Sequence, residues 1–100
     1  MPDTYASGRW QVVPGREDEF IVRWKEFLEW TRLHHPAMID ASLLQEVTTQ
    51  SDFISFSEWK NADARDHWKH DPGFAVKMSA CQALCQRMVG KDYERVVHVP

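Results

Sequence analysis

The order in which hydrophobic periodicity changes along the chain constrains the fold more than any other feature of its 100 residues. Apolar residues that alternate with polar ones indicate strands, and apolar residues that recur every three or four positions indicate helices. In chain order, this pattern predicts a strand over 6–12, a helix over 16–34, strands over 38–47 and 53–59, a helical segment over 61–90 and a final strand over 93–99. With right-handed crossovers, this β-α-β-β-α-β order predicts a ferredoxin-like α+β fold, in which helices back one face of a four-stranded antiparallel sheet.

The first expected helix has clear start and stop signals. Three acidic residues, 17–19, follow Pro14-Gly15 and stand where the positive end of the helix dipole would lie. Pro36 disfavours helical dihedral angles in the residue before it, so the helix should end at Leu33 or His34. Between these ends, one face carries a regular stripe of Phe20, Trp24, Phe27, Leu28 and Thr31. The segment is therefore an amphipathic helix whose stripe faces the core.

The second helical region contains an internal break. Asn61 is a suitable N-cap for a short helix that runs to about His70, and Pro72 should then kink or split the helix. A second apolar stripe at helical spacing follows and ends before Gly90; its members are Phe74, Met78, Cys81, Cys85 and Met88. This spacing places Cys81 and Cys85 on one helix face, where buried thiols are favoured over half of a zinc site because zinc usually takes four ligands.

The strand over 53–59 carries apolar residues on both faces. Ile54 and Phe56 share one face, while Phe53 and Trp59 lie on the other. The helices of so short a chain can cover only one face of the sheet, so the pattern predicts a homodimer in which two sheets pack face to face. The alternative is that Phe53 and Trp59 tuck under loops or the chain ends.

Composition and charge narrow the class of protein. The net charge is −3 with acidic and basic residues interleaved, which argues against a nucleic-acid partner. The sequence contains neither an apolar run long enough to cross a bilayer nor a secretory signal pattern at its beginning. We therefore expect one globular domain over 1–100 that is soluble and cytoplasmic, without a membrane partner.

Few residues form a recognisable catalytic pattern. The five histidines do not have metal-site spacing, and phosphate loops, nucleophile elbows and paired catalytic carboxylates are not evident, so no metal site is expected. Aromatic residues are abundant enough to line a pocket for a flat apolar ligand, although core packing explains most of them. Trp68 has Arg65, His67 and Phe74 nearby in the sequence, where a pocket between helix and sheet could form, but the favoured interpretation is that Trp68 is the largest core residue of a short helix.

Three segments resemble the antibiotic-biosynthesis monooxygenase family: 12–20, 53–59 and 64–74. Together with their spacing, they extend the resemblance over nearly the whole chain. The resemblance implies a dimeric α/β barrel, and it implies activities that range from cofactor-independent oxygenation of quinols or polycyclic aromatic polyketide intermediates to oxidative heme degradation. No cofactor is expected for the oxygenase branch.

The resemblance can be followed at individual positions. In the heme-degrading branch, a helix tryptophan matches Trp68, but the heme-ligating histidine falls on Met78 and the first-strand asparagine falls near Gly8. Heme degradation is therefore disfavoured. In the polyketide-oxidising branch, the substrate-facing asparagine and tyrosine fall on Ala64 and Phe74.

The candidate site residues follow from these matches and departures. Trp68 is the matched catalytic position, and His67 is the candidate general base. The expected substrate-contacting residues are Trp59, Phe74, Met78, Arg65 and Arg87. The leading hypothesis is a cofactor-independent monooxygenase that acts on an electron-rich aromatic or quinol-like molecule.

Two other functions remain open. The chain could be a noncatalytic dimeric barrel that binds a small apolar ligand in a stress-related or accessory role, which the departures at Ala64, Phe74 and Met78 favour. It could also be a polyketide cyclase or dehydratase, because the same fold hosts such activities.

Overall fold

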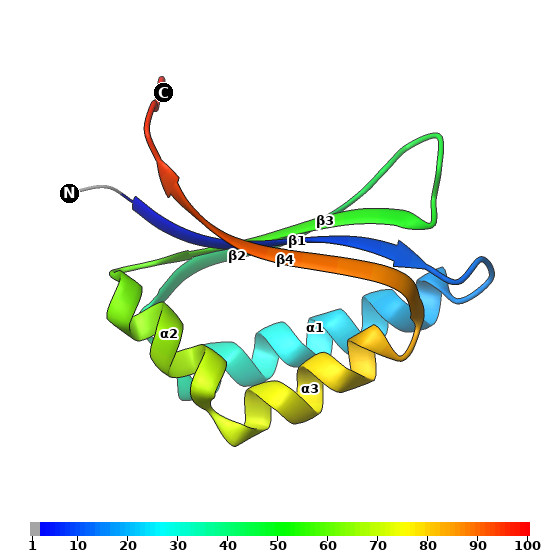
Figure 1. Ribbon diagram of the computed structural model, residues 1–100, viewed down its shortest axis with the longest axis horizontal. Coiled ribbons are helices and arrows are strands. Elements are labelled where there is room, and N and C mark those ends of the chain that lie inside the picture. The colour runs from blue at the N-terminus through cyan, green and yellow to red at the C-terminus, as the bar shows by residue number, and fades with distance from the viewer. Residues whose placement is uncertain (1–2) are drawn as a thin grey trace.

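A four-stranded antiparallel sheet organises the computed structural model, which describes residues 3–100 (Figure 1). The elements are β1 (Asp3–Val12), α1 (Glu17–His34), β2 (Met38–Gln45), β3 (Asp52–Trp59), α2 (Ala62–His70), α3 (Pro72–Gln82) and β4 (Cys85–Arg95). The strand order is β2-β3-β1-β4, and every neighbouring pair is antiparallel. The ferredoxin-like α+β fold predicted from the sequence is therefore confirmed.

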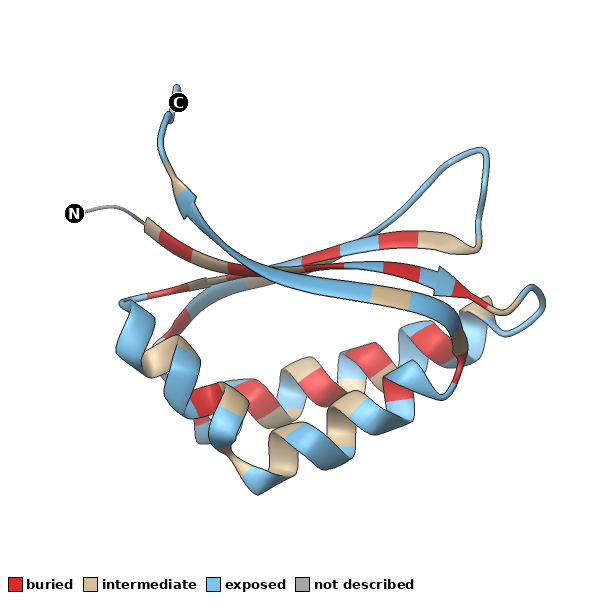
Figure 2. Ribbon diagram, viewed as in Figure 1, coloured by how far each residue is buried: buried red, intermediate tan, exposed pale blue. Residues whose placement is uncertain are grey.

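All three helices cover the same face of the sheet, and the other face is open (Figure 2). Phe53 and Trp59 point into the helix-covered side and are buried, while Ile54 and Phe56 point to the open side and are exposed. The two-faced pattern predicted for β3 is thus confirmed. Phe53 and Trp59 lie under helices and not under loops or chain ends.

Helix α1 follows the predicted amphipathic pattern closely. It begins at Glu17 with acidic residues in its first turn and ends at His34, two residues before Pro36. Its buried positions are Phe20, Trp24, Phe27 and Thr31. Phe20 packs on Phe53 of β3 with ring centroids 5.0 Å apart, and Trp24 meets Trp10 of β1 at 4.8 Å. The helix therefore lies over the two central strands.

The break between the second and third helices is also confirmed. Asn61 accepts a hydrogen bond from the Ala64 N–H and caps α2, as expected for that position. Asp71 then has extended dihedral angles, and its side chain accepts the Gly73 N–H at 2.9 Å, which caps α3. Pro72 occupies the first turn of α3, where its missing amide hydrogen costs nothing.

The boundary between α3 and β4 differs from the prediction. The helix ends at Gln82, and β4 runs from Cys85 to Arg95. Cys85 and Met88 therefore lie in a strand, and Cys81 and Cys85 do not share a helix face. The expected strand over 93–99 was wrong at both ends. Pairing decides the outcome, because β4 pairs with β1 from Asp3↔Arg95 to Val12↔Cys85. The apolar spacing is compatible with a helix, but the ladder also pairs the backbone groups on one edge of β1, which a longer helix would leave without partners.

Smaller differences occur at the ends of other strands. β1 begins at Asp3, earlier than the predicted residue 6, and β2 ends at Gln45, not at Val47.

Burial raises the pKa of the Cys81 thiol to about 12 and that of the Cys85 thiol to about 11. Both thiols are therefore protonated at neutral pH and behave as small apolar groups. Within residues 3–100, no helix is long and apolar enough to cross a membrane.

Candidate functional site

Three aromatic rings surround Trp68, between the sheet and the helices. The Trp68 ring centroid lies 4.8 Å from that of Trp59 and 4.7 Å from that of Phe74, and it stacks on Phe27 at 5.7 Å. Trp68 is only 5 % exposed. The sequence-predicted residues Trp59, Trp68 and Phe74 are therefore brought together, and in this conformation their rings fill the space between them.

Hydroxyl groups fix the orientation of the buried indole rings. Trp68 Nε1 donates to Thr31 Oγ1 at 3.1 Å, and Thr31 Oγ1 in turn donates to the carbonyl of Phe27. On β3, Ser57 accepts from Trp59 Nε1 at 2.9 Å. These bonds hold the rings in one arrangement and satisfy donors that would otherwise be buried without partners.

A histidine–aspartate pair stands beside the aromatic rings. His35 is 6 % exposed, and its Nε2 lies 2.8 Å from Asp71 Oδ2. His67 is exposed, and its ring centroid lies 5.8 Å from that of His35, which is also 6.4 Å from Trp59. His35 is thus a neighbour both of the predicted base and of the aromatic rings.

Asp71 is expected to make stability depend on pH. The Gly73 amide and then the His35 side chain hydrogen-bond the carboxylate and hold the pKa of Asp71 below its ordinary value of 3.8. A lowered folded-state pKa contributes stability that is present above the unfolded pKa and is lost as pH falls through the folded one. Urea unfolding between pH 5 and pH 2 should therefore show a loss of stability that Asp71→Asn reduces. Asp18→Asn, at an exposed position in the first turn of α1, is the matched control, and an unchanged profile in Asp71→Asn would contradict the assignment.

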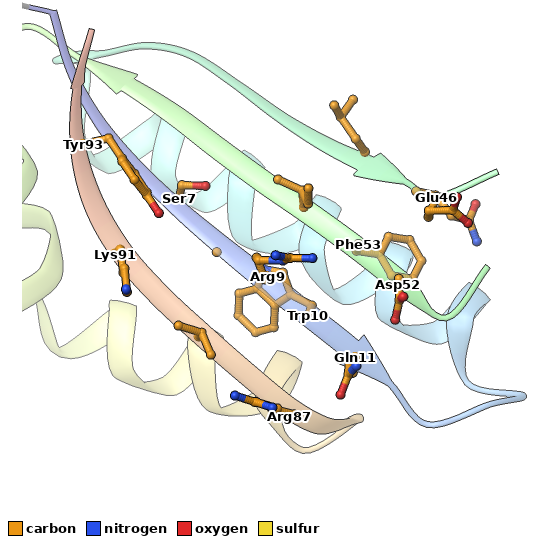
Figure 3. A pocket seen from close by; sticks show the side chains of 15 residues that line it. Ser7, Arg9, Trp10, Gln11, Glu46, Asp52, Phe53, Arg87, Lys91 and Tyr93 are labelled. Carbon is orange, nitrogen blue, oxygen red and sulfur yellow. The ribbon is translucent and has the colours of Figure 1, made fainter. Parts of the chain in front are cut away.

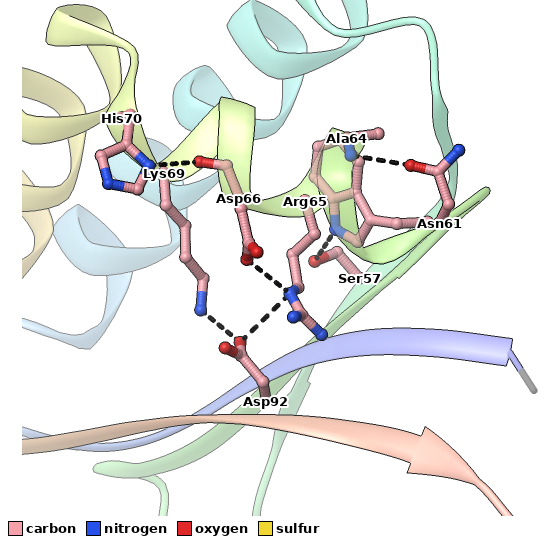
Figure 4. Close-up of polar contacts among 9 residues, drawn as sticks. Ser57, Asn61, Ala64, Arg65, Asp66, Lys69, His70 and Asp92 are labelled. Atoms are coloured by element: carbon pink, nitrogen blue, oxygen red, sulfur yellow. Dashed lines mark hydrogen bonds and ion pairs between the residues drawn. The ribbon is translucent and has the colours of Figure 1, made fainter.

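Charged side chains join α2 to β4 at the border of the aromatic rings (Figure 4). Arg65 Nε lies 3.2 Å from Asp66 Oδ1 and 3.7 Å from Asp92 Oδ1, and Lys69 Nζ also pairs with Asp92. The Arg65 side chain is mostly buried, so its guanidinium needs these carboxylates. The predicted residue Arg65 is consequently held at the edge of the site by a partner on the sheet.

The open face of the sheet forms a second region with a hollow of about 660 Å³ (Figure 3). Arg87 lies here together with Arg9 and Lys91, on the face opposite Trp68. The structure therefore does not bring Arg87 together with the other predicted site residues. Met78, in contrast, packs against the same core as Trp68.

Sequence reasoning did not single out Thr31, His35 or Asp71 as site residues. Asp71 has a recognisable signal, because an aspartate before Pro72 is a typical helix cap. His35 has none, since its contact with Asp71 spans 36 positions in the sequence. Only the fold places these two side chains next to each other.

Comparison with known proteins gives a consistent picture. Residues 5–77 match the family model of the antibiotic biosynthesis monooxygenases. The fold is similar to that of SnoaB, a cofactor-independent oxygenase from Streptomyces nogalater, with a TM-score of 0.90, 19 % identity, and coverage of 100 % of this chain and 99 % of that one. A conserved protein from Methanosarcina mazei is similar with a TM-score of 0.82, 21 % identity, and coverage of 93 % and 92 %. No curated protein sequence matches the chain.

Proposed function

We propose a function that starts from one fact: the chain belongs to the antibiotic biosynthesis monooxygenase family. Its role is monooxygenase-like at the level of this family. In our proposal it oxidises an electron-rich aromatic or quinol-like small molecule without a cofactor. The observation that carries the proposal is the aromatic cluster around Trp68, which has the histidine–aspartate pair at its side.

The chemistry requires little from the protein besides a base and a dry pocket. A base removes a proton from an activated CH₂ or phenolic OH of the substrate, and the resulting carbanion reduces O₂. A C–O bond forms, the O–O bond breaks, one oxygen atom becomes the product carbonyl and the other leaves as water. The substrate supplies all four electrons, so no external reductant is needed. Exclusion of water protects the intermediate.

We assign the roles as follows. Trp59, Trp68 and Phe74 would contact the flat ring of the substrate, since aromatic rings favour stacked and edge-on contacts. His67 would act as the base, and His35 lies next to it with its orientation fixed by Asp71. Met78 and Arg65 would border the ligand from α3 and α2. Binding at Trp68 requires the rings to separate, because they are in contact with one another.

We also propose that the protein is a homodimer whose two open sheet faces pack together. Ile54, Phe56, Val89 and Tyr93 are all exposed on this face, and such a group of exposed apolar residues is typical of an interaction surface. In a two-fold dimer the same surface meets itself, so each copy covers the apolar residues of the other. The basic side chains Arg9, Arg87 and Lys91 surround the hollow and would lie within this interface.

A noncatalytic dimeric barrel that binds a small ligand is the second candidate. The tight packing of Trp68 favours it, as do the apolar residues Ala64, Phe74 and Met78 at positions where oxygenases and heme-degrading relatives are expected to carry polar groups. A polyketide cyclase would use the same pocket. Heme degradation is disfavoured further by Gly8, where a Cβ atom would come within 2.7 Å of Trp10 Nε1, so an asparagine there requires Trp10 to move.

Oxygen uptake by the metal-free protein tests the proposal against anthrones, naphthoquinols and simple quinols. We expect uptake above the uncatalysed rate with at least one class. Trp68→Phe should reduce it, because the indole that contacts the substrate is replaced by a smaller ring. Oxygen uptake no faster than the uncatalysed rate for every compound would rule out oxidation of these substrate classes and favour the ligand-binding barrel.

A further inference from the structure

A groove on the helix-covered side, away from Trp68, arises from the way α1 sits on the sheet. Phe20 and Trp24 anchor α1 over the central strands β1 and β3. The edge strand β2 is therefore only partly covered, and its helix-facing residues Ala41 and Leu43 remain half-buried. Between α1 and β2 this leaves a groove of about 730 Å³.

The groove has an apolar interior and a rim without net charge. Buried Trp24, Met38 and Phe53 are accompanied by the less buried Leu28, Leu43 and Ile21. Two basic residues, Lys25 and Arg32, and two acidic residues, Glu29 and Asp40, lie among the lining residues. The volume and the apolar character are those of a small-molecule site, and the balanced charges favour a neutral molecule over an ion.

Arg32, which lines the groove, is held by hydrogen bonds to β2. Its Nη1 donates to the Met38 carbonyl at 2.6 Å and its Nη2 to the Ile39 carbonyl at 3.4 Å. These bonds attach the last turn of α1 to the first residues of β2. The wall of the groove next to Arg32 is thus supported by side chain–backbone bonds between α1 and β2.

Trp24 supplies the second, independent observation. It is 6 % exposed, and within residues 3–100 its Nε1 is the one buried side-chain nitrogen or oxygen that has no hydrogen-bond partner. The buried indoles of Trp10, Trp59 and Trp68 each donate to a serine or threonine hydroxyl. A buried donor without an acceptor is costly. Trp24 is one of the residues that line the groove, so a ligand in the groove supplies the missing acceptor once the side chains that cover Nε1 move aside.

We propose that the α1–β2 groove binds a neutral, flat, apolar molecule whose carbonyl or phenol oxygen accepts a hydrogen bond from Trp24 Nε1. The aromatic character of this ligand rests on the proposed function, and the groove is then a site for the substrate or product that is separate from the Trp68 cluster. The bond from Trp24 selects ligands that carry an oxygen acceptor over hydrocarbons of the same shape.

Two probes of matched shape test the acceptor requirement: 9-fluorenone, which carries one ketone oxygen, and fluorene, which carries none. Each is titrated into ¹⁵N-labelled protein while the indole N–H signals of the five tryptophans are followed. Fluorenone should move the Trp24 signal downfield and bind roughly five- to tenfold more tightly than fluorene. Trp24→Phe should remove the preference for fluorenone, because it lowers fluorenone affinity much more than fluorene affinity.

Two further variants keep the test decisive. Val76→Ala, at an exposed position on α3 outside the lining of the groove, should leave the affinity of both probes unchanged. Leu43→Arg, which retains the Trp24 donor but fills the groove with a charged side chain, should weaken both probes at least tenfold. It also provides an answer if Trp24→Phe fails to fold.

The proposal is overturned if neither probe binds, if the two probes bind equally, or if the shift appears at the Trp68 indole and not at Trp24. Oxygen uptake, measured on the same protein, distinguishes failure of the groove proposal from failure of the proposed oxygenase activity. Oxidation of a quinol without fluorenone binding at Trp24 would rule out the groove as a ligand site and leave the proposed oxygenase activity standing. Fluorenone binding at Trp24 without oxidation of any quinol would support the groove site and rule out oxygenation of these substrates.

Discussion

Trp68→Ala is expected to lower the free energy of unfolding by about 3–5 kcal/mol, the range typical of a buried aromatic residue truncated to alanine. The ring contacts Phe27, Trp59 and Phe74, and its Nε1 donates to Thr31. Removing it leaves a cavity between three rings that the surrounding backbone cannot fill. It also removes the only buried residue of α2, so this helix loses its anchor to the core.

Urea unfolding at a fixed protein concentration measures this effect, since the stability of a dimer depends on concentration. Trp68→Phe is the matched control, because it retains a ring in the same position and loses only the larger indole and its hydrogen bond. We expect its loss to be less than half of that caused by alanine. A loss below about 1 kcal/mol for Trp68→Ala would mean that α2 is held elsewhere and that packing is not the main role of Trp68.

Phe56→Arg is expected to separate the proposed dimer into monomers. Phe56 lies in the middle of β3 on the open face and is 39 % exposed in a single chain. In a face-to-face dimer, two-fold symmetry would bury two guanidinium groups without partners. The dimer dissociation constant should rise by about 100-fold or more, which corresponds to a cost of about 2.7 kcal/mol.

Sedimentation velocity at micromolar concentration measures the oligomeric state directly. Val76→Arg is the control, because Val76 is also an exposed apolar residue but lies on α3, on the helical side of the molecule. It should leave the dimer intact. A wild-type protein that sediments as a monomer, or a Phe56→Arg variant that remains a dimer, would contradict face-to-face packing of the sheets.

Local patterns were sufficient to predict most of the fold. The stripe on α1, the two faces of β3 and the break at Asp71-Pro72 depend on residues close together in the sequence, and all three are confirmed. The end of α3 is different, because the spacing of Cys81 and Cys85 fits a continuous helix. Residues from Cys85 onward form a strand instead because they pair with β1. That pairing joins the two ends of the chain, so no local window contains it.

The candidate site was less accessible from the sequence for the same reason. Trp68 could be singled out by its place in a family pattern, but its contact with Thr31 spans 37 positions and that of His35 with Asp71 spans 36. Arg87 was expected at the site, yet strand alternation on β4 places it on the opposite face. The apolar spacing of that region predicts a helix, in which the Arg87 side chain would point in a different direction from the one it has in a strand.

The most direct test of the proposed oxygenase activity is the fate of labelled oxygen. The metal-free protein is incubated under ¹⁸O₂ with the quinol or anthrone that gives the fastest oxygen uptake, and the product mass is determined. Our account predicts one ¹⁸O atom in each product molecule, formed faster than without protein and more slowly with Trp68→Phe. A product without ¹⁸O, or formation at the uncatalysed rate, would contradict a cofactor-independent monooxygenase.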